Sequence, residues 1–392
     1  MVQRLIIAGG GLSGVLAAMA FAERGDVAVT LLEAADRLGG AHTWSFYASD
    51  LDAAATRLVG PLVAHRWSGY DVRFAGLARA LTTPYRTITA ASLDRAARER
   101  LGERVLLEAP VAALDAAGAT LADGTRLPAD AVLDARGPTG LAGLALAYQS
   151  FVGQEVALAA PHGLRQPTIM DATVDQLGGY RFVYLLPYSP TTLLVEDTYY
   201  TETPVLDRDT VAARIAAYAE TRGWRIAEVR GEERGALPLV LSGDGAAMWA
   251  AAAPAGGAVP IGLRAGLFHP VTSYSLPLAA RTAVALSRLA GPLTTQRLRG
   301  EVQALVRRHF AATSFERLLN RMLFLAGPPQ DRHRILERFH RLPQPLIERF
   351  YAGRLRRADQ ARILMGRPPV PIGGALRAIR ARPAAGVSVP RP

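Results

Sequence analysis

The chain has 392 residues, enough to bury a large core and to form two or three structural units. Half of its residues are hydrophobic, which excludes an intrinsically disordered protein. It contains no cysteine, which excludes a catalytic thiolate, a redox-active disulfide and a cysteine-based zinc site, and we expect no metal centre. The net charge of +11 is unevenly spread, because residues 297–382 carry 19 arginines against 6 acids while residues 1–296 carry 25 arginines against 28 acids.

The first forty residues predict one complete supersecondary unit. Residues 4–8 are apolar and predict a buried strand, and Gly-Gly-Gly-Leu-Ser-Gly at 9–14 predicts a turn. Residues 15–24 predict a helix, and residues 27–32 a second strand that ends at Glu33. A strand, glycine turn, helix, strand and acid in this order are typical of a Rossmann-like dinucleotide-binding domain.

Each glycine of the turn has a mechanical reason. Gly9 permits the tight turn, Gly11 lets the backbone approach a pyrophosphate, and Gly14 lets the helix pack against the strand. The pyrophosphate would lie on the free N–H groups at the start of the helix, and Glu33 would accept hydrogen bonds from a ribose. The nucleotide contacts predicted for this unit are Gly9, Gly10, Gly11, Leu12, Ser13, Gly14 and Glu33.

The segment after Glu33 indicates which nucleotide binds. The pattern acid, three residues, Arg37-Leu-Gly39-Gly40 resembles the loop that lies against the flavin nucleotide in many FAD enzymes. Arg37 can offer a planar fork of donors to phosphate or ribose oxygens, and the two glycines leave room for a flat ring. We therefore predict FAD as the cofactor. No second strand–GxGxxG–helix unit occurs, so we expect no separate domain for a nicotinamide cofactor.

The order of predicted elements indicates an α/β protein with a discontinuous FAD-binding domain, an inserted β-rich substrate domain and a helical C-terminal part. The apolar strand at 131–135 is assigned to the nucleotide sheet by its likeness to flavoproteins of this type. The segment 259–266, with Gly262 and Gly266, predicts a third cofactor contact before a helix at 279–289. The predicted units are FAD-binding domain 1–145, substrate domain 146–244, returning FAD-binding part 245–295, and a basic helical region 296–392, with helices as far as about residue 376.

Two adjacent acids stand in the second strand of a predicted hairpin. Residues 180–186 and 192–200 flank a Pro-Tyr-Ser-Pro turn, and strand alternation puts Glu196 and Asp197 on opposite faces. One of the two should face the interior, where burial would raise its pKa and make it a general acid. The alternative is a strand end that reaches solvent with both acids hydrated.

Four segments carry a resemblance to the bacterial lycopene β-cyclase family. The resemblance extends from Leu5 to Ile379 and implies cyclisation of the ψ-ends of lycopene, through γ-carotene, to β-carotene. It also implies that FAD acts in its reduced form without net redox change, and that NAD(P)H is the source of electrons. The matching segments are 42–46 (HTWSF), 194–198 (LVEDT), 266–275 (GLFHPVTSYS) and 364–372 (LMGRPPVPI). Tyr47 and Ser273 depart from the pattern, since relatives often carry histidine and glycine at these positions.

The resemblance assigns roles to individual side chains. Glu196 is the expected proton donor, and Asp197 is either a partner that tunes Glu196 or the acid itself. Reduced flavin and the aromatic faces of Trp44, Phe46 and Tyr274 are expected to stabilise the carbocation. His42 and His269 are either cofactor-loop or structural histidines, and His42 is counted among the predicted cofactor contacts.

The expected partners are lycopene and related ψ-end carotenoids. Residues 245–263 form the longest uncharged run, but prolines and glycines interrupt it, so we expect a soluble or peripheral protein. We predict a cytoplasmic location at the inner face of the cell membrane, where the basic C-terminal region would meet anionic lipid. A solvated arginine-rich surface is the alternative. No nucleic-acid partner is expected.

Two other functions share the same sequence features. The first is a true flavin oxidoreductase, either an FAD-dependent monooxygenase or a prenyl-lipid reductase. The second is a non-catalytic carotenoid-binding flavoprotein. Consumption of reductant with each product would indicate the first, and the absence of any product would indicate the second.

Overall fold

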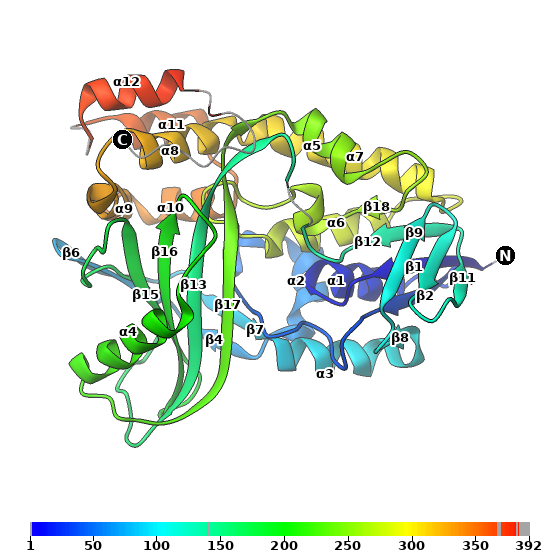
Figure 1. The fold of residues 1–392 in the computed structure, drawn as a ribbon, viewed down its shortest axis with the longest axis horizontal. Helices are drawn as coiled ribbons and strands as arrows, with labels where there is room; N and C mark the ends of the chain where they lie inside the picture. The colour runs from blue at the N-terminus through cyan, green and yellow to red at the C-terminus, as the bar shows by residue number, and fades with distance from the viewer. Residues whose placement is uncertain (1, 139–140, 367–369, 382, 384–392) are drawn as a thin grey trace.

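The computed structural model describes residues 2–138, 141–366, 370–381 and 383. Two sheets form the centres of two lobes that lie side by side (Figure 1). A five-stranded sheet lies in the lobe that holds the N-terminus, and a seven-stranded sheet lies in the other. The predicted α/β class, with a parallel sheet and a helical C-terminal part, is confirmed.

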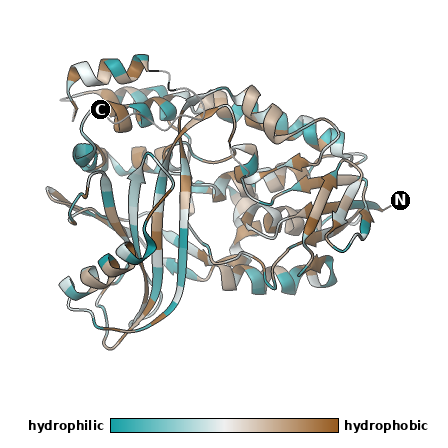
Figure 2. Ribbon diagram, viewed as in Figure 1, coloured by the Kyte–Doolittle hydropathy of each residue, from teal (hydrophilic) through white to brown (hydrophobic). Residues whose placement is uncertain are grey.

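The five-stranded sheet is parallel and has β1 at its centre. Leu5 and Ile7 of β1 pack into the main core on one face, and Ile6 packs into a smaller core on the other. The apolar residues of these strands are brown in Figure 2. In sheet order the strands are β18 (Val259–Pro260), β12 (Ala131–Asp134), β1 (Gln3–Ala8), β2 (Val27–Leu32) and β8 (Val105–Leu106).

Helices cover one face of this sheet and a small antiparallel sheet covers the other. The first helix begins at Leu12, three residues before the predicted start, because the extended backbone of Gly11 caps it directly. The covering helices are α1 (Leu12–Phe21), α2 (Ala53–Val59), α3 (Ala90–Leu101) and α6 (Leu276–Ser287). The small sheet contains β9 (Val111–Asp115), β10 (Gly118–Leu121) and β11 (Arg126–Pro128).

The seven-stranded sheet contains the predicted hairpin, here β15 and β16. Two of its strands, β5 and β6, come from the first 145 residues, so this sheet is not built from the predicted segment 146–244 alone. Helix α4 (Arg208–Thr221) packs on one face, and the other face turns toward the first lobe. In order the strands are β17 (Ile226–Gly243), β13 (Leu144–Leu158), β16 (Thr192–Thr201), β15 (Tyr180–Pro187), β14 (Thr168–Asp171), β5 (Tyr70–Phe74) and β6 (Leu77–Leu81).

A three-stranded antiparallel sheet and the remaining helices complete the structure. The sheet consists of β3 (Thr43–Tyr47), β7 (Tyr85–Thr89) and β4 (His65–Trp67). The helices predicted after residue 295 are confirmed, and the last of them extends to Arg380. They are α7 (Thr295–Ala312), α8 (Ser314–Leu325), α9 (Arg332–His340), α10 (Gln344–Tyr351), α11 (Arg357–Leu364) and α12 (Ile372–Arg380), and α5 (Gly245–Ala252) precedes them. Residues 367–369 of the LMGRPPVPI segment lie outside the described residues.

In the part of the chain that the structure describes, no helix is both long enough and apolar enough to cross a membrane.

Candidate active site

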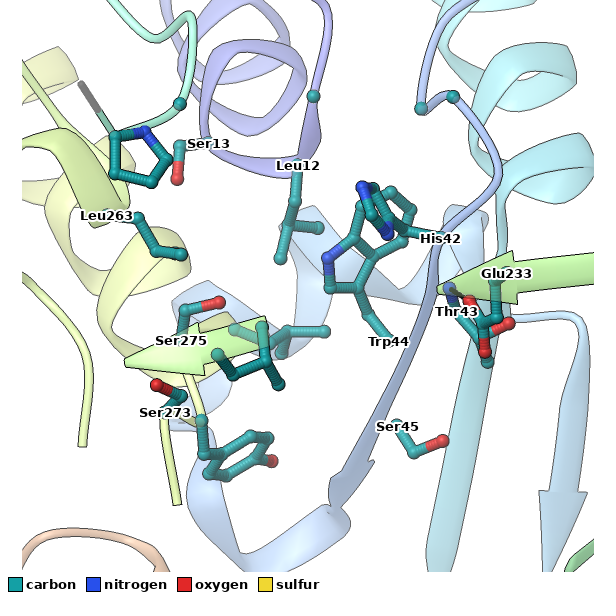
Figure 3. A pocket seen from close by; sticks show the side chains of 18 of the residues that line it. Leu12, Ser13, His42, Thr43, Trp44, Ser45, Glu233, Leu263, Ser273 and Ser275 are labelled. Carbon is teal, nitrogen blue, oxygen red and sulfur yellow. Dashed lines mark hydrogen bonds between the residues drawn. The ribbon is translucent and has the colours of Figure 1, made fainter. Parts of the chain in front are cut away.

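One cavity of about 680 Å³ joins the glycine turn of the first lobe to the seven-stranded sheet of the second. Its volume is in the range of small-molecule and cofactor sites. Gly9, Gly11, Leu12 and Ser13 line one end, and strands β13, β15, β16 and β17 line the other. The strand β3, which carries the HTWSF segment, contributes Trp44 and its neighbours between the two ends (Figure 3).

Gly9, Gly11 and Gly14 of the turn differ in what surrounds the position of the missing side chain. Gly9 has φ +103°, and a Cβ there would lie 2.6 Å from the backbone of Ala135. A Cβ on Gly14 would lie 1.9 Å from the carbonyl oxygen of Gly9, so helix and turn are in direct contact. A Cβ on Gly11 would meet nothing within 4 Å. The start of α1 therefore opens onto free space at Gly11, which fits a bound pyrophosphate.

Glu33 lies at the cavity wall with its carboxylate already oriented. It accepts hydrogen bonds from the backbone N–H of Gly10 at 2.6 Å and of Ala35 at 2.9 Å. Gly10 itself does not line the cavity, since the position of its missing side chain is turned toward Glu33 and Leu38. The geometry fits a residue that holds the turn and still presents an acceptor to a ribose.

The loop after Glu33 meets the cavity through its glycines. Gly39 and Gly40 both line the cavity and have φ +81° and +60°. The Arg37 side chain is 69% exposed, lies 3.7 Å from Asp36, and is not among the lining residues. The contact between Arg37 and the cofactor therefore stays a prediction.

The segment 259–266 reaches the cavity through apolar side chains and not through its glycines. Ile261 and Leu263 line the wall, whereas Gly262 and Gly266 do not. Gly262 permits close packing on the glycine turn, because a Cβ there would lie 2.3 Å from Ser13 Oγ. Gly266 packs against Met248 and lies away from the predicted contact.

The HTWSF segment divides between cavity and core. His42 and Trp44 line the cavity and contact each other edge to face, with ring centroids 6.0 Å apart (Figure 3). Burial lowers the pKa of His42, so this ring is neutral at pH 7. Phe46 is buried in the main core and does not line the cavity, so its predicted role in stabilising a cation lacks geometric support. Tyr47, the residue after it, lines the cavity instead.

Tyr274 faces the cavity and is held by a buried acid that the sequence analysis missed. Its hydroxyl donates to Asp50 Oδ2 at 2.5 Å, and the N–H of Tyr47 donates to the same oxygen at 3.0 Å. Burial raises the pKa of Asp50 to about 6. Asp50 lies more than 200 residues from Tyr274 in the chain, so no local pattern could have paired them.

Two residues of the 266–275 segment have clear structural roles. Ser273 has φ +54°, a region that favours glycine, and its hydroxyl donates to the carbonyl oxygen of Pro238. His269 is buried against the ring of Phe350, and burial lowers its pKa to about 3. His269 does not line the cavity, which supports the structural alternative for this histidine.

Glu196 is buried and lines the cavity. The Thr198 hydroxyl donates to its Oε1 at 2.6 Å. Burial raises the pKa of Glu196 to about 7, the hydrogen bond from Thr198 opposes this, and the charge of Asp197 adds to it. A carboxyl group with these surroundings is poised to donate a proton near neutral pH.

Asp197 faces the other side of the same strand, as strand alternation predicts. It is fully buried and lies 2.9 Å from Arg181 Nε, and the Tyr199 hydroxyl donates to it at 2.7 Å. It does not line the cavity. Both acids are thus buried, and the alternative in which the strand end is hydrated is wrong. This geometry supports the alternative in which Asp197 tunes Glu196.

A second cavity carboxyl, Glu233 on β17, was not found from the sequence. It is buried, lines the cavity, and accepts a hydrogen bond from the N–H of Thr43 at 2.8 Å (Figure 3). Burial and the charge of Glu196 raise its pKa to about 9. The sequence does contain a signal, since Glu232-Glu233 repeats the pattern of two adjacent acids in a strand. Polar residues and glycines flank Glu232 and Glu233, so the sequence did not indicate that this part of the strand is buried.

Aromatic side chains form a large part of the rest of the wall. Tyr184 donates to Ser45 at 2.7 Å, and its hydroxyl lies 3.0 Å from that of Tyr85. Aromatic faces can stabilise a cation, and an apolar wall excludes the water that would trap one. The aromatic lining residues are Trp44, Tyr47, Tyr85, Phe151, Phe182, Tyr184, Tyr200, Tyr274 and Tyr351.

Comparison with solved structures agrees with this architecture. A tetrameric form of 2-methyl-3-hydroxypyridine-5-carboxylic acid oxygenase matches with a TM-score of 0.60 at 16% identity, covering 92% of this chain and 98% of that one. A flavin-dependent halogenase from Xanthomonas campestris matches with a TM-score of 0.59 at 15% identity, covering 96% and 95%. At these identities the likeness concerns the fold alone.

Sequence relatives are much closer. The chain is 47% identical over 384 residues to the lycopene beta-cyclase of Paracoccus sp. (strain N81106 / MBIC 01143), covering 98% of each protein. It is 45% identical over 377 residues to the lycopene beta-cyclase of Pseudescherichia vulneris, covering 95% of this chain and 96% of that protein. Residues 4–377 match the family model described as lycopene cyclase protein. With this match over nearly its whole length, the chain belongs to the lycopene cyclase family.

Proposed function

We propose that this protein cyclises the ψ-ends of lycopene to β-rings, through γ-carotene to β-carotene, with no net redox change. The observation that carries the proposal is Glu196, a buried carboxyl with a raised pKa in an aromatic cavity. The names of the two relatives support the substrate and the ring type. Protonation of a double bond by such a carboxyl needs no net transfer of electrons, whereas a flavin oxidoreductase consumes reductant with each product.

The chemistry follows from the position of Glu196. Its carboxyl group protonates the terminal double bond of the substrate and generates a tertiary carbocation. The neighbouring double bond attacks this carbon and closes the ring, and loss of a ring proton forms the new ring double bond. Trp44 and Tyr274 present aromatic faces to the same space, and each contact with a desolvated cation contributes on the order of 0.5–2 kcal/mol.

FAD fits the other end of the cavity. Gly11 leaves the start of α1 open for a pyrophosphate, Glu33 offers an acceptor for a ribose, and Gly40 leaves space for a flat ring. Bound in its reduced form, FAD would supply negative charge near a developing cation. NAD(P)H as the electron source is part of this proposal, and anaerobic bleaching of the bound flavin on addition of NADPH would test it.

Expression in a host that accumulates lycopene, followed by chromatography of the pigments, tests the function. We expect β-carotene, with γ-carotene as an intermediate. Unchanged lycopene in a host that contains folded, flavin-loaded protein would contradict the proposal and favour a non-catalytic carotenoid-binding protein. Reductant consumed in proportion to product would favour a monooxygenase or a prenyl-lipid reductase.

The glycine turn gives a prediction about the cofactor. Gly11→Ala should fold normally, because its Cβ meets nothing within 4 Å, yet it should lose FAD affinity at least tenfold because the methyl group enters the pyrophosphate space. Titration of the apoprotein with FAD, followed by flavin fluorescence, measures this affinity.

A matched control is Gly300→Ala on α7, where a Cβ also meets nothing within 4 Å. It should leave FAD affinity unchanged. Equal affinity of the Gly11→Ala variant and the wild type would show that the pyrophosphate lies elsewhere.

We also propose that α12 is the membrane-facing element of a peripheral protein at the inner face of the cell membrane. Ile372, Leu376 and Ile379 share one exposed face of α12, while Gly374 and Ala378 pack inward, with Gly374 against α8. The helix lies at the outer edge of the second lobe, and it contains both brown and teal residues in Figure 2.

Other side chains extend this surface. Exposed Leu364 and Met365 at the end of α11 add apolar side chains, and Arg362, Arg377 and Arg380 add basic ones. An apolar face with flanking arginines is typical of helices that lie in the headgroup region of anionic bilayers.

Flotation with phosphatidylglycerol-containing vesicles measures the binding. The double change Ile372→Glu and Leu376→Glu should reduce vesicle binding at least tenfold. Two carboxylates would then stand where apolar side chains enter the lipid layer, and the anionic headgroups would repel them. Val205→Glu is the control, since Val205 is an exposed apolar residue outside this surface and its change should have no effect. Undiminished binding of the double variant would exclude α12 as the contact.

A further inference from the structure

Glu233 and Glu196 approach the cavity from the two sides of one backbone position. In the seven-stranded sheet, Gly153 of β13 pairs with Glu196 of β16 on one side and with Glu233 of β17 on the other. A Cβ at position 153 would lie 3.3 Å from Glu196 Cβ and 3.3 Å from Glu233 Cγ. The missing side chain therefore leaves the space between the stems of the two glutamates clear.

We propose that Glu196 and Glu233 form a proton-sharing pair, in which Glu233 is the second catalytic carboxyl of the cyclisation proposed above. Both side chains are buried, and both line the wall of the cavity that holds the aromatic residues. The proposal rests on the proposed function but adds a residue and a role to it.

Burial makes the doubly ionised pair unfavourable. It raises the pKa of Glu196 to about 7, and burial together with the charge of Glu196 raises that of Glu233 to about 9. Between these values the pair holds one proton, which belongs to the pair and not to either residue. The pair thus carries one proton at a pH slightly above 7, as in a cell interior.

The groups packed around the pair are neutral or negative. Thr198 donates to Glu196, and the N–H of Thr43 donates to Glu233. Tyr188 stacks on His65 with ring centroids 4.4 Å apart, and burial lowers the pKa of His65, so that ring carries no charge at neutral pH. The other titratable groups that sense the pair or act on it are Tyr85 on β7, Tyr184 on β15, Tyr188 directly after β15 and Asp197 on the far face of β16.

The pair balances the protons of the reaction. The O–H bond of Glu196 breaks as a C–H bond forms at the terminal double bond, which leaves two carboxylates beside the cation. Ring closure forms a C–C bond from the neighbouring double bond. A ring C–H bond then breaks, its electrons form the new double bond, and the proton goes to Glu233. Transfer of this proton from Glu233 to Glu196 restores the starting state without oxidant or reductant.

The test is the pH–rate profile of Glu233→Gln in the flavin-loaded protein. The amide oxygen can still accept from Thr43, so a merely structural role is retained, but the side chain can no longer carry the proton. Removing the negative neighbour lowers the pH at which Glu196 loses its proton. We expect the alkaline limb to move from about 9 to about 7, with at least a tenfold loss of rate at pH 8.

Two further variants make the result decisive. Gly153→Ala keeps both carboxyls but inserts a methyl group between the stems of the two side chains. It should force them apart and weaken their coupling, so its alkaline limb should also move to lower pH. Glu232→Gln is the control, because Glu232 is paired with Arg208 and does not line the cavity, and its profile should match the wild type.

The outcomes separate this proposal from the proposed function. A wild-type profile for Glu233→Gln overturns the pair, and if Glu196→Gln is inactive in the same assay the cyclase function still stands. If the wild-type protein forms no cyclic product, the function fails and the pair fails with it. Loss of folding by Glu233→Gln leaves the Gly153→Ala profile to decide, and an unshifted limb there overturns the pair.

Discussion

Glu196→Gln should abolish most of the conversion of lycopene, with a loss between about 10²- and 10⁴-fold, the range that a general acid contributes. Glutamine has the size of glutamate and can still accept the hydrogen bond from Thr198, but it has no proton to give at neutral pH. Pigment chromatography measures the conversion, and flavin absorbance measures cofactor content.

The cofactor content should not change in this variant. Glu196 lies on the seven-stranded sheet, whereas the residues that fit FAD lie on the glycine turn and the loop after Glu33. Glu228→Gln, at an exposed glutamate on β17, provides the control and should keep full activity. Full activity of Glu196→Gln with normal flavin content would remove the acid from the proposed mechanism.

Asp197→Asn should lower the stability of the folded protein far more than it lowers the cyclisation rate. The change leaves Arg181 charged and buried without its partner, which typically costs about 3–5 kcal/mol. For a chain of this size we expect the Tm to fall by roughly 4–6 °C. The protein that remains folded should keep Glu196 in place, and its cyclisation rate should change only a few-fold, since Asp197 contributes only one part of the raised pKa of Glu196.

Thermal unfolding of Asp197→Asn and of a double variant measures this effect. The double variant Arg181→Met with Asp197→Leu removes both charges, so it should recover much of the lost stability. An Asp197→Asn protein with the wild-type Tm and no activity would reverse the assignment and make Asp197 the acid. The pair of predictions for residues 196 and 197 thus separates a catalytic acid from a structural acid one position apart.

The likeness to flavin enzymes of other reactions has a physical explanation. The glycine turn and its sheet supply a site for a dinucleotide, and this part of the architecture is independent of the reaction. The seven-stranded sheet supplies the carboxyl groups of Glu196 and Glu233, and the fold alone does not determine which side chains stand at these positions. The proposed chemistry therefore depends on these two side chains and not on the fold.

Local sequence patterns were sufficient to predict the glycine turn and the two faces of the strand that carries Glu196 and Asp197. The spacing of Gly9, Gly11 and Gly14 sets a turn whose steric demands arise within the first fourteen residues and the strand beside them. Strand alternation was likewise sufficient to place Glu196 and Asp197 on opposite faces, since successive side chains of any strand point to opposite sides. The hairpin that contains them is closed by a short turn, so its register is also local.

The cavity could not be predicted in the same way, because contacts between distant segments decide which side chains face it. Glu233 meets Glu196 only because β13 pairs with both β16 and β17, and 80 residues separate Gly153 from Glu233. Phe46 and Tyr47 are both aromatic, and only the packing of β3 against the core assigns the first to the interior and the second to the cavity. The amino-acid order thus determined the strand–turn–helix–strand unit and the opposite faces of Glu196 and Asp197, because short-range steric contacts act between neighbouring residues. Strand pairing and the packing of the two lobes decided which side chains line the cavity, among them Glu233, because burial depends on residues that lie far apart in the chain.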